Sequence, residues 1–86
     1  MTAGTLRDAV EHALEGRWHE AHEIAQAHEG KPIADWLHAV LHKIEGDAGN
    51  AGYWYRRAGR MDRVDADATG ELAEIGAAVA ATAAPS

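Results

Sequence analysis

The stretch Pro32-Ile-Ala-Asp-Trp-Leu-His-Ala-Val-Leu-His-Lys-Ile44 decides how this chain folds. Its large apolar side chains recur at steps of three and four residues: Ile33, Trp36, Leu37, Val40, Leu41 and Ile44. That spacing is typical of one face of an α-helix. Glu45-Gly46-Asp47 then interrupts the pattern, and a second helical run follows with aromatic residues at 53–55. The stretch and its continuation therefore predict a helix, a tight turn and a returning helix over about residues 32–59.

A unit of the same kind is predicted ahead of this stretch, at about residues 5–28. Thr5 and Asp8 have the spacing of a capping box, and Gly16 suits a reversal between two helices. After the stretch, one helix is predicted over about residues 62–83, because apolar side chains again lie at steps of three and four: Val64, Ala68, Leu72, Ile75 and Val79. We expect one all-α domain made of two stacked antiparallel helical hairpins and a C-terminal helix.

Composition narrows the classes of function. The chain has 86 residues, a formal net charge of −6, six histidines and no cysteine. Without cysteine, disulfides and thiolate metal sites are excluded. No window approaches the length of a membrane span, and the first residues lack the apolar run of a signal peptide, so a cytoplasmic protein without membrane contact is expected. The acidic balance disfavours nucleic acid as a partner.

The sequence repeats itself after thirty residues. The pattern A-V-x-H-x-[LI]-E-G occurs at residues 9–16 and again at residues 39–46. An alanine follows five residues after each glycine, at Ala21 and Ala51. Periods of this size are typical of stacked helical hairpins. The glycine allows the chain to reverse, and the alanine allows the returning helix to approach its partner closely.

The run Gly46-Asp47-x-x-Asn50-Ala51-x-x-x-Tyr55-x-x-Ala58 resembles the turn and second helix of a tetratricopeptide repeat. The resemblance covers about residues 33–60, with a weaker echo at residues 3–28. The period here is thirty residues, whereas that family uses 34. The resemblance implies a hairpin architecture and binding of a protein partner, and no binding residue is carried over from it.

Aromatic residues are the first candidates for contact with a partner. Consecutive helical residues point about 100° apart, so Tyr53, Trp54 and Tyr55 cannot share one face. At least one ring is expected to reach the surface or a partner, unless a neighbouring helix covers it. We therefore predict a protein-interaction module with Trp54, Tyr53 and Trp36 as anchors. Two hairpins are fewer than three repeats, which favours self-association, most simply as a homodimer.

Histidines offer an alternative function. His38 and His42 stand four residues apart on one predicted helix, and helical histidines at that spacing can share a metal ion. His12 occupies the position of His42 in the first repeat, so it is a possible third ligand. The alternative interpretation is a binding site for a divalent metal such as zinc, or for a small ligand. The simplest interpretation is a polar helix face whose imidazoles bond to Asp35 and Glu45.

Nothing in the sequence predicts an enzyme or a bound cofactor. There is no cysteine nucleophile, and no glycine-rich loop follows a strand, because no strand is predicted. The last cluster consists of four arginines: Arg56, Arg57, Arg60 and Arg63. Beside aromatic rings they suit an anion such as RNA. The other interpretation is charge balance with Asp62, Asp65 and Asp67, which the overall acidity favours.

Overall fold

The computed structural model describes residues 4–83. The regular elements in this range are all helical, which confirms the predicted all-α class: α1 (Leu6–Leu14), α2 (Trp18–Ala27), α3 (Pro32–Ile44), α4 (Ala48–Ala58), the 3₁₀ turn η1 (Met61–Arg63) and α5 (Ala68–Ala83). Within the described range, no helix combines the length and the apolar character needed to cross a bilayer.

Residues at their N-termini explain where α1, α3 and α4 begin. The Thr5 hydroxyl accepts the Asp8 N–H (3.1 Å), and the Asp8 carboxylate accepts the Thr5 N–H (3.0 Å), so the predicted capping box is present. At α4, Asp47 accepts the Asn50 N–H (3.2 Å). Pro32 begins α3, where its missing N–H costs no helical bond.

The two turns of the repeat have the same structure. Gly16 and Gly46 take left-handed φ angles of 79° and 87°. The same backbone bond closes each turn, from the Arg17 N–H to the His12 carbonyl (2.8 Å) and from the Asp47 N–H to the His42 carbonyl (2.9 Å). This closure is the glycine-dependent helix ending that satisfies the last carbonyls. The predicted chain reversals at both glycines are confirmed.

A pair of substitutions tests the turn at Gly46. We expect Gly46→Ala to destabilise the fold by about 1–2 kcal/mol, because alanine is strained at this positive φ. A Cβ there would meet no atom within 4 Å, so the cost is one of backbone conformation alone. Gly49→Ala, inside α4, should stabilise by about 0.5–1 kcal/mol, since its Cβ makes only an ordinary contact at 3.9 Å. Urea unfolding measures both, and shifts in the same direction would contradict this account.

The C-terminal helix begins later than predicted. The expectation of one helix over residues 62–83 was wrong at its start, because η1 and a bend precede α5 at Ala68. Asp67 starts the new helix by accepting the Gly70 N–H (3.0 Å). In addition, Lys43 of α3 donates to three carbonyls of the connection: Arg63 (3.2 Å), Val64 (3.4 Å) and Ala66 (2.6 Å). Those carbonyls would otherwise serve a continuous helix.

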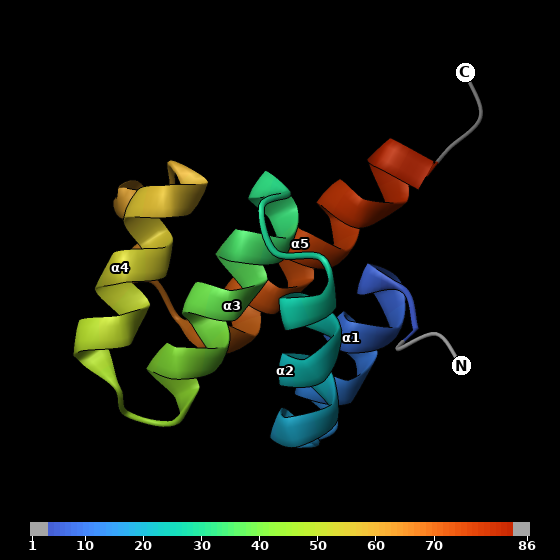
Figure 1. The fold of residues 1–86 in the computed structure, drawn as a ribbon, viewed down its shortest axis with the longest axis horizontal. Helices are drawn as coiled ribbons and strands as arrows, with labels where there is room; N and C mark the ends of the chain where they lie inside the picture. The colour runs from blue at the N-terminus through green and yellow to red at the C-terminus, as the bar shows by residue number, and fades with distance from the viewer. Residues whose placement is uncertain (1–3, 84–86) are drawn as a thin grey trace.

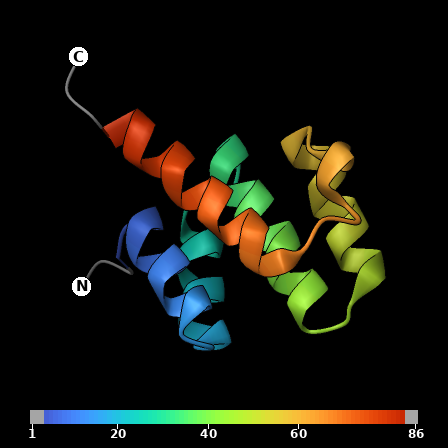
Figure 2. The same ribbon diagram turned by 180° about the vertical axis from the view of Figure 1, so that it is seen from behind.

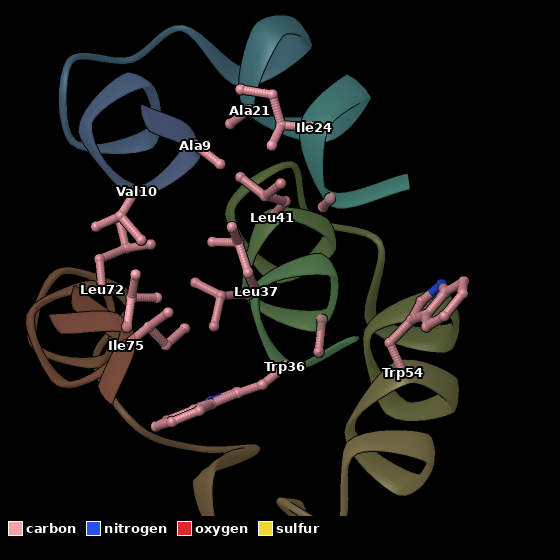
Figure 3. Close-up of a cluster of buried hydrophobic side chains, with 14 of the residues drawn as sticks. Ala9, Val10, Ala21, Ile24, Trp36, Leu37, Leu41, Trp54, Leu72 and Ile75 are labelled. Carbon is pink, nitrogen blue, oxygen red and sulfur yellow. The ribbon is translucent and has the colours of Figure 1, made fainter. Parts of the chain in front are cut away.

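α3 lies at the centre of the molecule (Figure 1). α4 packs against it on one side, α2 on another, and α5 crosses both α1 and α3 on the face seen in Figure 2. Residues 34–41 are therefore all buried. The core side chains in Figure 3 come from all five α-helices and converge on Leu37 and Leu41. Asp35 and His38, which were expected on a polar face of this helix, are buried as well.

One buried carboxylate links three helices. Glu71 of α5 is 1% exposed and accepts hydrogen bonds from Trp36 Nε1 (2.8 Å) and Tyr55 Oη (2.8 Å). Lys43 Nζ forms an ion pair with the same carboxylate. The donors come from α3 and α4, so Glu71 determines how α5 docks. Burial and the hydrogen bond to Glu71 together raise the pKa of Tyr55, so this hydroxyl stays a donor.

Candidate metal centre

Three histidines converge between α2 and α3. Each of His22, His38 and His42 offers a ring nitrogen, and the three nitrogens lie within 4.8 Å of one another. Nε2 of His22 is 3.0 Å from Nε2 of His38. The His38 and His42 rings are stacked, with centroids 5.0 Å apart and planes at 18°. The cluster thus combines two histidines from one helix with a third from its neighbour.

Tryptophan packing positions His22. Trp18 begins α2 and donates from Nε1 to the Leu41 carbonyl of α3 (2.7 Å), which joins the two helices. Trp18 and His22 stand four residues apart on the same helix face, and their rings stack with centroids 4.5 Å apart. The His22 imidazole is therefore held against α3, although it remains partly exposed.

His38 is the buried member of the cluster. The residue is 3% exposed, and its ring stacks on Trp54 of α4 with centroids 3.9 Å apart. Its Nδ1 atom is buried and has no hydrogen-bond partner among residues 4–83. A buried polar atom without a partner is costly, and an ion bound at Nε2 of the same ring would not contact it.

His42 is oriented by a carboxylate. Its Nδ1 lies 2.9 Å from Oε1 of Glu45, three residues further along the chain. Since a carboxylate only accepts, the Nδ1–H donates, and the lone pair of His42 is placed on Nε2. A carboxylate behind an imidazole is the usual arrangement of a histidine that ligates a metal, because it fixes the tautomer and raises basicity.

The electrostatics of the cluster favour neutral imidazoles. Burial, with a further contribution from the neighbouring His22 and His42 rings, lowers the pKa of His38 to about 4 from an ordinary 6.5. Burial also lowers the pKa of His22, and His42 adds to the effect. The neutral form is the one that binds a metal ion. Burial thus favours the neutral form of His38 and of His22.

The spacing fits a small transition-metal ion after a modest adjustment. Two nitrogens at 2.0–2.1 Å from a tetrahedral zinc are about 3.3 Å apart. The Nε2 atoms of His22 and His38 lie 3.0 Å apart in a hydrogen bond, so the shared proton must move to an Nδ1 or leave before both atoms bind one ion. The three ring nitrogens lie within 4.8 Å of one another, so binding of one tetrahedral ion requires the rings to move closer together. Asp47 also lies near His42, but it already caps α4.

Two of the three histidines in this cluster were among the metal-ligating residues predicted from the sequence. His38 and His42 are brought together, and the third member is His22 in place of the expected His12. One repeat separates His12 from His42, so each occupies the same position in its own helix pair. α2, the second helix of the first pair, is the helix that packs beside the two α3 histidines, so it supplies His22. In the sequence, the feature that pointed to His22 was its four-residue spacing from Trp18 on α2.

The predicted aromatic anchors have different surroundings. Tyr53 is 46% exposed, whereas Trp36 and Trp54 are only 4% and 9% exposed. Figure 3 places the two tryptophans on different sides of α3. Trp36 bonds to Glu71 of α5, and Trp54 stacks on His38. Both indole rings are thus used inside the fold, and Tyr53 alone of the three presents its ring to solvent.

Comparisons of the chain with protein-family models, with curated proteins and with solved structures found no match.

Proposed function

We propose that this protein binds one transition-metal ion, such as zinc, through His22, His38 and His42. The observation that carries the proposal is the convergence of three ring nitrogens within 4.8 Å from two helices. Imidazole ligands suit zinc, copper and nickel, and they suit calcium and magnesium poorly. The bound ion would join α2 to α3, so that binding free energy also stabilises the fold.

Each ligand has a distinct part in this proposal. His42 is held by Glu45 in the tautomer that directs Nε2 away from the carboxylate. His38 is buried and neutral, and its Nε2 offers a lone pair in the tautomer that carries the proton on Nδ1. His22 is partly exposed and provides the side from which an ion enters. Three protein ligands leave a fourth tetrahedral position for water or another ligand.

Calorimetric titration with zinc tests the proposal. We expect one ion to bind per chain. His22→Ala or His42→Ala should weaken zinc binding about 100-fold, which corresponds to roughly 2.7 kcal/mol of binding free energy. Both residues are partly exposed, so their loss should leave the fold intact. Zinc at 100 times its dissociation constant should add about 2.7 kcal/mol to the free energy of unfolding.

The matched control is His19→Ala. His19 lies on the same helix as His22, is exposed, and pairs with Glu23 (2.9 Å). Its removal should leave zinc affinity unchanged. Absence of binding to the wild-type chain, or an equal loss in the His19 variant, would refute the metal site.

A second candidate is a protein-interaction module of two stacked hairpins in the manner of tetratricopeptide repeats. The identical turns at Gly16 and Gly46 support the stacked arrangement. The exposed ring of Tyr53 supports a binding role. Leu14 and Ile44, which are equivalent in the repeat, are both exposed, and they support self-association. The solution mass of the chain is the direct measure of self-association.

A further inference from the structure

Three arginines near the end of α4 have no acidic partner in the part of the chain that the structure describes. Among residues 4–83, Arg56, Arg57 and Arg60 are exposed, and none forms an ion pair with a carboxylate. Arg63 behaves differently, since it pairs with Glu74 (2.8 Å) and Asp62 (3.4 Å). Charge balance with the following aspartates therefore explains only the last arginine of the cluster.

Aromatic rings support two of these three side chains. The Arg57 guanidinium lies 4.9 Å from the Trp54 ring centroid and 5.8 Å from that of Tyr53, and it donates to the Tyr53 hydroxyl (3.3 Å). The Arg60 guanidinium lies 4.5 Å from the Trp36 centroid. A cation held over a ring keeps its orientation, and stacking leaves the N–H edge of the guanidinium free. The tryptophans expected as anchors thus serve as platforms for arginines.

The positive charge is concentrated in one part of the sequence. Residues 31–60 contain five lysines and arginines against three acidic residues, whereas residues 4–30 contain two against six, and residues 61–83 one against five. A long polyanion such as nucleic acid would meet the acidic remainder of the molecule. A short acidic segment would contact the positive region alone. Charge complementarity therefore favours the short segment.

We propose that Tyr53, Arg56, Arg57 and Arg60 form a docking face for an aspartate- and glutamate-rich segment of a partner protein. Tyr53, Arg56 and Arg57 follow the steps of three and four that place residues on one side of α4, and Arg60 follows the end of that helix at Gly59. Guanidinium groups bind carboxylates through two parallel hydrogen bonds, and arginine and tyrosine are frequent interface anchors. Because the rings already restrict Arg57 and Arg60, binding costs less side-chain entropy. This proposal deepens the second candidate function and is independent of metal binding.

Fluorescence anisotropy with a labelled oligoglutamate peptide tests the docking face. The wild-type chain should bind the peptide at low salt and lose affinity as salt rises. Arg57→Glu should weaken binding at least tenfold, and Arg57→Lys should weaken it measurably, because a lysine keeps the charge but not the two-pronged geometry. Arg7→Glu is the matched control: it changes the net charge equally, but Arg7 lies on α1 and pairs with Glu11.

Three outcomes would overturn the proposal: no peptide binding at low salt, equal losses in the Arg57→Glu and Arg7→Glu variants, or tighter binding of a labelled single-stranded oligonucleotide than of the peptide. Zinc titration of Arg57→Lys, which keeps the positive charge that acts on His38, should match the wild type, so a failed metal site is separable from a failed docking face. Sedimentation velocity of the chain without peptide reports self-association separately. Circular dichroism verifies that each variant is folded.

Discussion

Replacing Glu71 by alanine is expected to lower the free energy of unfolding by about 3–5 kcal/mol, the usual cost of removing one partner from a buried ion pair. The variant leaves Lys43 without its carboxylate. It also leaves the Trp36 indole N–H and the Tyr55 hydroxyl without the acceptor they share. A domain of this length has a total stability of roughly 4–13 kcal/mol, so the loss is a large part of the whole.

Glu74→Ala is the matched control for this experiment. Glu74 lies three residues further along α5, is exposed, and pairs with Arg63. Exposed pairs contribute about 0–1 kcal/mol, so the control should remain near the wild type. Glu71→Gln keeps the size of the side chain but loses its charge, and it should fall between the two. Urea unfolding measures all three, and a cost below about 1 kcal/mol for Glu71→Ala would contradict the role of this carboxylate.

Acidification of the metal-free protein is the second large effect. The pKa of His38 is about 4 in the folded protein and 6.5 ordinarily. Between these values the unfolded chain binds more protons, so stability falls as pH falls. The loss begins below about pH 6.5 and is complete near pH 4, and for His38 alone it amounts to at most about 3 kcal/mol. The lowered pKa of His22 adds to it in the same direction.

Unfolding by urea at several pH values, with a chelator present, measures this dependence. His38→Phe keeps an aromatic ring against Trp54 but removes the titrating group, so its stability should vary less between pH 6.5 and 4. The lowered pKa values of Asp8 and Asp47 act below their ordinary value of 3.8, outside this window. An unchanged slope in His38→Phe would show that His38 does not carry the effect.

Local signals in the sequence predicted the helix boundaries well where a side chain or a glycine acts on its own backbone. Thr5 caps α1 through Asp8, and Gly16 and Gly46 end their helices in the same left-handed conformation. The prediction failed at residues 62–67, where Lys43 from a distant helix takes the carbonyls of the connection. Periodicity of apolar residues contains no information about such a donor.

The candidate site, too, was predicted from the sequence only in part. The four-residue spacing of His38 and His42 is enough to place both side chains on one face of a helix. His22 joins them only because α2 packs on α3, and the repeat pointed to His12 in its place. The sequence likewise predicted that at least one of the consecutive aromatic residues reaches the surface or a partner unless a neighbouring helix covers it, and the packing of α4 on α3 left Tyr53 exposed.

The amino-acid sequence by itself determined an all-helical chain with two equivalent reversals, because capping bonds, glycine conformations and helical periodicity act over a few residues. Tertiary structure decided which polar groups from different helices meet: the three histidines between α2 and α3, and Glu71 with its donors from α3 and α4. Contacts of this kind join residues 16 to 35 positions apart. They depend on how helix faces pack, which the pattern along one helix does not specify.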